Sequence, residues 1–240
     1  RSFISKIYSY HEKRACKTID GIISVTPIIC ARFSKFHPNV EMIANYPQIK
    51  TNEKQIAERI ENHICYIGGL YESRGLREVI LAIEHCDVVL HLAGTFDTKQ
   101  FELELKQLKG WNKVIFYGQV NQEKITKLLD KCTIGIVTLH PTPSYLEAYP
   151  IKMFEYMNSG LAILASDFPL YKSLLEEIDC STFVDPLNPN DISKTLNAML
   201  ENQGRLKEMG NRAKKAANER YNWSKEKEKL YAFYDNLLHE

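Results

Sequence analysis

Short apolar runs alternate with longer mixed segments along most of this chain. An apolar run of roughly four to eight residues, bounded by turn-forming residues, is typical of a buried β-strand. The pattern predicts strands at GIISVT from Gly21, HICYI from His63, VVLHLA from Val88, KVIFY from Lys113, TIGIVT from Thr133, LAILA from Leu161 and STFV from Ser181, with a weaker pattern at VEMIA from Val40.

Amphipathic segments separate most of these strands. In GLREVILAIEHC and QEKITKLLDKC, apolar residues recur at the spacing of one helical face. These residues are Leu76, Val79, Ile80 and Ile83 in the first segment and Ile125, Leu128 and Leu129 in the second. Strand and helix in repeated alternation imply right-handed crossovers. The fold class is therefore α/β, with a doubly wound parallel sheet covered by helices on both faces.

A polar segment, NYPQIKTNEKQIAERIEN, interrupts this alternation at residues 45–62. It contains no strand pattern and is predicted to be a linker. The linker separates a short first part of the chain from a complete doubly wound domain.

The residues that break the apolar pattern follow predicted strands. They are Gly68 and Gly69 after HICYI, Gly118 after KVIFY, residues 139–149 after TIGIVT, and Ser166 and Asp167 after LAILA. Ligands of open parallel sheets bind at the carboxyl ends of the strands, so these residues predict one crevice. Gly68, Gly69 and Gly75 would let the backbone approach a ligand, and Arg74 offers phosphate a planar donor fork. The alternative is a pair of tight turns with a surface arginine.

The block EAYPIKMFEYMNSGLAILASD carries the most specific chemistry. Pro150 suits the first position of a helix and Gly160 the residue just past its end, so Glu147 falls in a loop and Glu155 in the second turn. Between the two carboxylates lies a helix N-terminus, which favours an anion. A phosphate flanked by two carboxylates that bind hydroxyls describes a nucleotide-sugar site. Two ordinary surface glutamates are the alternative.

Several other enzyme motifs do not occur. The segment IGGLYESRG has neither the G-x-G-x-x-G nor the G-x-x-x-x-G-K-[ST] spacing, which argues against a dinucleotide site and a P-loop. H-E-x-x-H and G-x-S-x-G are also missing. In the candidate loop, His140 is either polar lining or solvated. Tyr145 and Tyr149 either pack on a sugar or base, or cover the core.

Charge and cysteine usage exclude further classes. With 31 basic and 30 acidic residues, no global field attracts nucleic acid, and the locally basic residues 207–229 are interpreted as a solvated helical face. No run approaches the roughly 20 apolar residues that cross a bilayer. The six scattered cysteines form no metal motif and indicate reduced thiols in a cytoplasmic setting. Because the chain begins at Arg1, we expect its true N-terminus to lie upstream.

Three segments in this order carry a family resemblance: ICYIGGLYESRGLREVILAI, NKVIFYGQVNQEKITKLLDKCTIGIVTL and EAYPIKMFEYMNSGLAILASDFP. They resemble the donor half of the retaining glycosyltransferases of family 4 (group 1), which have the GT-B fold of two facing Rossmann-like domains. The resemblance implies a donor-binding domain at residues 63–222. It further implies an acceptor-domain remnant at 1–45, in which VEMIANYP resembles the interdomain crossover, a linker at 46–62, and a C-terminal helix at 223–240 that packs back toward the first part.

The resemblance also implies individual roles. Glu147 matches the glutamate that contacts the donor sugar and steadies it as the glycosidic bond opens, and Glu155 matches the glutamate that holds the ribose. Arg74 stands in the place of a lysine that clamps the diphosphate, and Lys152 is a second cation. The implied donor-binding residues besides Glu155 are Gly68, Gly69, Gly118, Gln119, Val120, Ala148, Tyr149, Pro150 and Ile151.

The implied reaction transfers a glycosyl group, with retention, from a UDP-, GDP- or ADP-sugar to a hydroxyl of a sugar or lipid-linked acceptor, as in bacterial surface polysaccharide synthesis. Arg74, Lys152 and the helix N-terminus would stabilise the departing diphosphate, so neither a divalent metal nor a cofactor is expected. One departure matters. Many members carry an arginine where this chain has Gly69, so Arg74 must act more alone.

Two other functions fit the same residues: a nucleotide-sugar epimerase on the GT-B scaffold and a non-catalytic donor-binding module. A cytoplasmic protein is expected, and peripheral contact with the inner face of the membrane is compatible with the family. Because a GT-B active site lies between two domains, we expect a missing N-terminal domain and no sugar transfer by this chain alone. The first part should then present incompletely covered apolar residues, chiefly Ile22, Ile23, Val25, Ile28 and Ile29.

Overall fold

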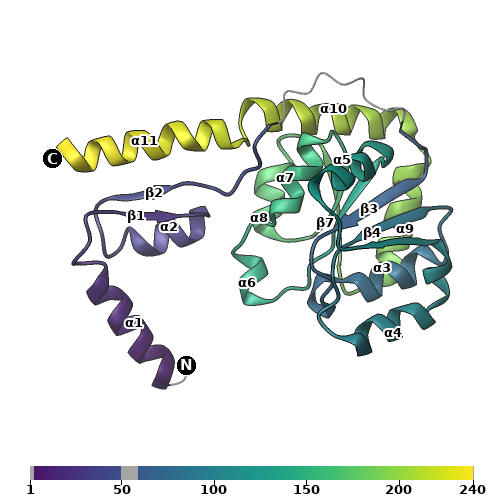
Figure 1. Cartoon of the computed structure of the whole chain (residues 1–240), viewed down its shortest axis with the longest axis horizontal. Helices are drawn as coiled ribbons and strands as arrows, with labels where there is room; N and C mark the ends of the chain where they lie inside the picture. The colour runs from purple at the N-terminus through teal and green to yellow at the C-terminus, as the bar shows by residue number, and fades with distance from the viewer. Residues whose placement is uncertain (1–2, 50–58, 240) are drawn as a thin grey trace. The chain divides into compact units, whose positions relative to one another are not determined.

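The structure is a computed structural model that describes residues 3–49 and 59–239. It divides into two compact units (Figure 1). We call Arg1–Gln48 with Asn222–Glu240 the terminal unit, and Ile49–Tyr221 the central unit. Within the described ranges, no helix combines the length and the apolar character that a membrane span needs.

A parallel sheet forms the centre of the central unit. In the described part of the chain it has six strands in the order β5-β4-β3-β6-β7-β8. The strands are β3 (His63–Ile67), β4 (Val89–Ala93), β5 (Val114–Gly118), β6 (Ile134–Val137), β7 (Ala162–Ser166) and β8 (Ser181–Val184). The six corresponding sequence predictions are confirmed, because each run forms a strand within two residues of its expected ends.

Helices connect these strands and cover both faces of the sheet, with α3 and α4 on one side and α5 and α7 on the other (Figure 1). The helical segments are η1 (Glu72–Arg74), α3 (Leu76–Ile83), α4 (Lys99–Gln107), η2 (Lys109–Lys113), α5 (Gln122–Lys131), α6 (Pro143–Leu146), α7 (Ile151–Asn158), α8 (Pro169–Leu175), α9 (Pro189–Leu200) and α10 (Gln203–Glu219). The arrangement confirms the expected α/β class with a doubly wound, Rossmann-like sheet.

The two helices predicted in detail are present with their expected faces. In α3 the predicted apolar residues Leu76, Val79, Ile80 and Ile83 are all buried. In α5, Leu128 and Leu129 are buried as expected, whereas Ile125 is only half-buried. Ile125 lies one turn nearer the carboxyl edge of the sheet, where it lines a cavity instead of the core.

Helix α7 begins one residue later than the sequence predicts, because Pro150 is its N-cap and Ile151 its first residue. The predicted end is confirmed: Gly160 takes the left-handed conformation at φ 71°. There the Gly160 N–H donates to Met157 O at 2.9 Å and the Leu161 N–H donates to Tyr156 O at 3.0 Å. These bonds satisfy the last carbonyls of the helix in a Schellman arrangement, which fixes the direction of the following strand.

The order of the strands creates a switch point between β3 and β6. From β3 the chain proceeds outward through β4 and β5, and then returns to β6 on the other side of β3. The connections that leave β3 and β6 therefore diverge to opposite sides, which opens a crevice at their carboxyl ends. Gly68 and the loop after β6 both lie at this edge of the sheet.

The terminal unit holds a parallel pair of strands, β1 (Ile22–Ser24) and β2 (Val40–Met42), with α1 (Phe3–Ala15), α2 (Pro27–Phe33) and α11 (Trp223–His239). Both remaining strand predictions are thus confirmed. Two hydrogen bonds tie α11 to the segment after β2. The Ala44 N–H donates to Glu226 Oε2 at 2.7 Å, and the Trp223 N–H donates to Pro47 O at 3.1 Å.

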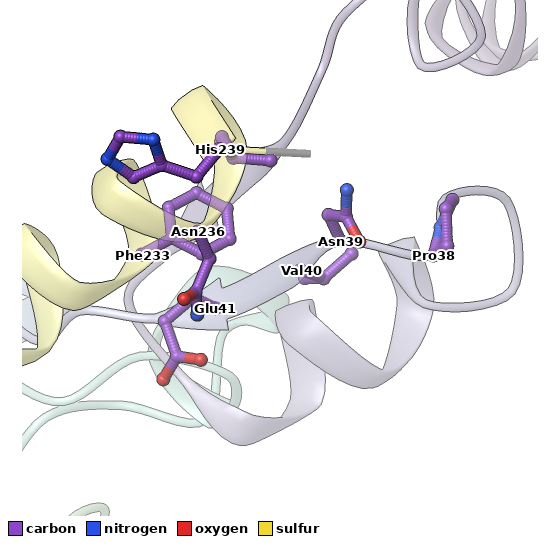
Figure 2. Close-up of a pocket in the computed structure, with 8 residues that line it drawn as sticks. Pro38, Asn39, Val40, Glu41, Phe233, Asn236 and His239 are labelled. Carbon is purple, nitrogen blue, oxygen red and sulfur yellow. The ribbon is translucent and has the colours of Figure 1, made fainter.

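A groove of about 440 Å³ lies between α11 and β2 (Figure 2). Phe233, which lines this groove, also packs against Gly21, because a Cβ placed on Gly21 would lie 2.6 Å from the Phe233 ring.

The assignment of this unit to an acceptor domain stays a prediction. Residues 45–49 and 59–62 contain no strand, as expected for a linker, and residues 50–58 lie outside the described residues.

The expectation of exposed apolar residues in the first part is wrong for one of the five. Ile22 is buried, because it and Ser24 point to the covered face of β1. Ile23, Val25 and Ile28 are exposed, and Ile29 is half-buried.

Candidate functional site

A cavity of about 350 Å³ opens at the switch point of the central sheet. Its volume falls in the range of small-molecule sites. The lining residues come from β3, η1, α5, the loop after β6, α6 and α7: Ile67, Gly68, Arg74, Ile125, Leu139, Tyr145, Ala148, Pro150, Ile151, Lys152 and Glu155.

The structure brings many of the predicted site residues into this one cavity. Those that line it are Gly68, Arg74, Ala148, Pro150, Ile151, Lys152 and Glu155. Six others do not line it: Gly69, Gly118, Gln119, Val120, Glu147 and Tyr149. Arg74, Lys152 and Glu155, the glutamate expected to bind the ribose, therefore meet at the cavity. Glu147, expected to contact the donor sugar, and the segment expected to contact the base do not line it.

Gly68 makes room for the cations of the cavity. A Cβ at this position would lie 3.3 Å from Arg74 Nη1 and 3.7 Å from Lys152 Nζ, and its φ of 117° disfavours any other residue. Arg74 and Lys152 therefore converge on the backbone at the end of β3. A site that concentrates positive charge against exposed backbone suits an anion.

Lys152 carries an unusually buried amine. Its side chain is 5% exposed, and its Nζ lies 3.4 Å from the centroid of the Tyr66 ring. No hydrogen-bond acceptor for Nζ is present among the described residues. Burial lowers the pKa of Lys152 well below its ordinary value, and the neighbouring Arg74 lowers it further, while Glu155 opposes the shift. The amine is thus buried without the hydrogen-bond partner that its desolvation calls for, and the residues that the structure describes supply none.

Arg74 is held by aromatic side chains. Its guanidinium carbon lies 5.1 Å from the centroid of the Tyr71 ring. Burial acts to lower the pKa of Arg74, but Tyr66 and Tyr145 together raise it, so the group stays charged. Its Nε has no hydrogen-bond partner among the described residues. The arrangement leaves donor capacity on Arg74 for a ligand.

The first turn of α7 adds backbone donors to the cavity. Pro150, the N-cap residue, makes no side-chain hydrogen bond to the helix, so it leaves the first N–H groups of α7 available to a ligand. One turn on, burial raises the pKa of Glu155, and Lys152 partly opposes this shift. The helix is held against the sheet by Tyr156, whose hydroxyl accepts the Ile67 N–H at 3.0 Å.

The predicted residues outside the lining have other surroundings. Glu147 is exposed and follows the last residue of α6. Tyr149 covers the core, since its ring meets Phe154 edge-on at 6.0 Å between centroids. The Tyr71 ring lies where a side chain on Gly69 would point, because a Cβ there would meet the ring at 2.5 Å. An arginine at that position would have to displace the Tyr71 ring.

The base-assigned segment lies after β5. Gly118 ends this strand at φ 64°, and a Cβ there would meet no atom within 4 Å. Ile125, in the helix that follows the segment, does line the cavity. The surface beside Gly118 is therefore open, and the helix that follows it reaches the cavity.

The sequence patterns did not single out Tyr66, whose ring lies against the amine of Lys152. The available signal was a tyrosine inside the strand run HICYI, two residues before Gly68. Of the two loop tyrosines, Tyr145 lines the cavity. His140 is neither solvated nor part of the lining, because its Nε2 lies 3.1 Å from Glu78 Oε2 and both side chains are largely buried.

Comparison with known proteins adds to this geometry. The family described as "Glycosyl transferases group 1" matches residues 48–216. Two similar proteins come from Methanocaldococcus jannaschii. "Uncharacterized glycosyltransferase MJ1607" is 27% identical over 168 residues, which cover 68% of this chain and 42% of the relative. "Uncharacterized glycosyltransferase MJ1069" is 23% identical over 197 residues, which cover 78% of this chain and 48% of the relative. The chain thus spans less than half the length of these curated relatives.

Solved structures share the fold at lower identity. A point mutant of TarM from S. aureus, in complex with Fondaparinux, alpha-GlcNAc-glycerol and UDP, superposes with a TM-score of 0.75 at 19% identity, and the match covers 94% of this chain and 46% of that one. Anabaena Alr3699/HepE, in complex with UDP and glucose, gives a TM-score of 0.76 at 17% identity, and the match covers 90% and 63%. At this identity the likeness concerns the fold alone.

Proposed function

Because the chain belongs to the group 1 glycosyltransferase family, we propose that the cavity binds the diphosphate and ribose of a nucleotide-sugar donor and serves a retaining glycosyltransferase. The observation that carries the proposal is the meeting of Arg74, Lys152 and the uncapped N-terminus of α7 at the switch point of the sheet. Backbone N–H groups and buried cations around one cavity suit a diphosphate.

Charge development explains how these groups would act. As the glycosidic bond opens, negative charge grows on the departing diphosphate, and donors fixed in a poorly solvated cavity stabilise it without reorganising. Arg74, Lys152 and the first turn of α7 take this role, so we propose that no divalent metal is required. Glu155 binds the ribose. Glu147 contacts the donor sugar once a donor extends from the cavity toward the end of α6.

The donor is a UDP-, GDP- or ADP-sugar, and a uridine nucleotide is the first to test, because similar folds were solved with UDP. Gly118, Gln119 and Val120 are the proposed base-contacting segment, and the open surface at Gly118 supports this assignment. We propose a sugar or lipid-linked acceptor, a role in surface polysaccharide or glycoconjugate synthesis, and a cytoplasmic enzyme that contacts the membrane peripherally.

Calorimetric titration of the protein with UDP, GDP and ADP, each with and without EDTA, tests the donor site. We expect at least one nucleotide to bind with micromolar to millimolar affinity, unchanged by EDTA. Arg74→Gln should weaken binding roughly tenfold or more, since hydrogen bonds to charged groups contribute about 1.5–3 kcal/mol. The matched control is Arg77→Gln, because Arg77 is paired with Glu72 and Glu104 and does not line the cavity. No binding of any nucleotide at millimolar concentration would contradict the proposal.

A non-catalytic donor-binding module is the second candidate. It is favoured by the position of Glu147, which is exposed and does not line the cavity. We propose that this chain needs a further domain for transfer and is inactive alone. An assay with labelled donor and sugar or lipid acceptors, run beside a protein extended to the length of the relatives, distinguishes the two. Acceptor-dependent turnover by the 240 residues alone would overturn the proposed inactivity.

A further inference from the structure

The amine of Lys152 belongs to the cavity wall and has no hydrogen-bond partner in the described part of the chain. It is one of the donors nearest to the backbone of Gly68, and its side chain is almost fully buried. The face of the Tyr66 ring offers only a weak attraction to a charged amine. An unpaired ammonium in such a place loses far more in hydration than one ring returns.

The titratable and charged groups around this amine come from three elements. From β3, Tyr66 lies under it and Cys65 acts on it electrostatically. From η1, Arg74 repels a positive charge on it. From α7 itself, Glu155 is the acidic neighbour, and it is partly buried. The fixed charge of Arg74 and the carboxylate of Glu155 oppose each other, so burial decides the charge state of the lysine.

We propose that Lys152 is uncharged in the free protein at neutral pH and takes up a proton from solvent when a nucleotide diphosphate enters the cavity. This inference rests on the proposed donor site. The proton binds the lone pair of Nζ, and the resulting ammonium then faces the phosphate oxygens. The site therefore presents one permanent cation, Arg74, and one cation that appears only with the anion.

Electrostatics gives the reason. Burial and Arg74 hold the pKa of Lys152 well down in the free protein. A diphosphate beside Nζ favours the ammonium and shifts the pKa upward. Between the two pKa values, binding must draw in a proton, so the affinity falls as the pH rises through that window. Below the free pKa the lysine is already charged and the affinity becomes independent of this group.

The test is calorimetry with intact nucleotide sugars: UDP-glucose, GDP-mannose and ADP-glucose. Unlike a free nucleoside diphosphate, whose terminal phosphate titrates near pH 6, these diesters lose no proton near neutrality. Titrations in two buffers of different ionisation enthalpy give the number of protons exchanged. At neutral pH we expect net uptake, approaching about one proton per donor bound, and an affinity that falls as the pH rises.

Three variants locate the proton. Lys152→Arg keeps a permanent charge, so uptake should vanish even where binding survives. Lys152→Met should abolish uptake and weaken binding roughly tenfold or more. Because an apolar side chain suits this buried position, Lys152→Met should melt no lower than the parent, which separates lost binding from lost folding. Glu155→Gln should retain uptake, since it removes a carboxylate and leaves the amine.

The outcomes separate this inference from the donor site. A nucleotide sugar that binds without proton uptake, or a Lys152 amine that NMR finds charged at neutral pH in the free protein, would overturn the proton-linked lysine and leave the donor site standing. Uptake that persists in Lys152→Met would assign the proton to another group and also overturn it. Failure of all three nucleotide sugars to bind would remove the donor site and the inference together.

Discussion

The central unit and the terminal unit both contain parallel β-strands, but they cover them differently. In the central unit every residue of β6 and β7 is buried. In the terminal unit β1 alternates between buried and exposed residues, and all of β2 is only half-buried. Parallel strands are normally buried on both faces. The terminal unit is therefore a parallel sheet whose faces are incompletely covered.

The difference shows which unit supplies the stability of the binding site. A sheet with helices on both faces can hold the cavity residues of β3 and α7 in fixed positions, since its core is closely packed. An incompletely covered pair of strands cannot supply comparable packing energy. In the terminal unit a polar contact stands out instead: the fully buried carboxylate of Glu226, which accepts the Ala44 N–H and pairs with Lys229.

The largest expected effect tests this contrast in packing. Leu164→Ala, in β7, should lower the free energy of unfolding by about 2–5 kcal/mol, because it leaves a cavity in a fully buried core. Ile23→Ala, in β1, should cost about 0.5 kcal/mol or less, because Ile23 is 40% exposed. Urea unfolding followed by circular dichroism measures both. A similar loss in the two variants would mean that the exposed face of β1 is covered in solution.

The buried carboxylate gives the next effect. Glu226→Ala should destabilise the terminal unit by about 1.5–3 kcal/mol, because it removes a charged acceptor and leaves the Ala44 N–H unpaired. Hydrogen exchange at Ala44 and along α11 reports the loss. Glu228→Ala is the control, since Glu228 is exposed and has only a long contact with Lys225. If Glu226→Ala and Glu228→Ala lower the stability of the terminal unit equally, the contact between Glu226 and Ala44 does not stabilise it.

A chain of hydrogen bonds across the central sheet makes its stability depend on pH. His91 Nε2 lies 2.7 Å from His63 Nδ1, and His91 Nδ1 lies 2.8 Å from the Tyr117 hydroxyl. Burial, with a smaller contribution from His63, lowers the pKa of His91 to about 4. The unfolded chain binds this proton near pH 6.5 and the folded chain does not, so stability is lost as the pH falls.

From pH 7 to pH 5 we expect a loss of about 1–2 kcal/mol at this site, allowing for partial solvent screening. Urea unfolding at both pH values measures it, and His91→Gln should flatten the dependence. If His91→Gln keeps the full pH dependence of the unfolding free energy, a group other than His91 causes that dependence.

The smallest effect concerns the two carboxylates assigned to the donor. Glu155→Gln should weaken binding of the bare nucleotide several-fold, since a hydrogen bond to a neutral hydroxyl contributes about 0.5–1.5 kcal/mol. Glu147→Gln should leave this affinity unchanged and lower only transfer by the extended protein. Glu226→Gln, in the terminal unit, is the third arm and should not alter nucleotide binding. Parental affinity in Glu155→Gln would refute the ribose assignment.

Much of the central unit follows from local pattern. Apolar runs such as LAILA and TIGIVT predict buried parallel strands because both of their faces meet helices, and the regular spacing in α3 predicts its buried face. Gly160 predicts the end of α7 because a left-handed residue with no Cβ terminates a helix. The predicted start of α7 differs from the observed start by one residue, since a proline such as Pro150 fits both the N-cap and the first turn.

The sequence alone also predicted that Gly68, Arg74 and Glu155 lie at one edge of the sheet, because the carboxyl ends of parallel strands share an edge, and the family resemblance added Lys152. Only the tertiary structure decided which side chains face the cavity. It set Lys152 over the Tyr66 ring with no hydrogen-bond partner among residues 3–49 and 59–239, filled the place beside Gly69 with the Tyr71 ring, and left Glu147 at the surface. These outcomes depend on contacts between residues far apart in the chain, whose burial and electrostatics no local pattern contains.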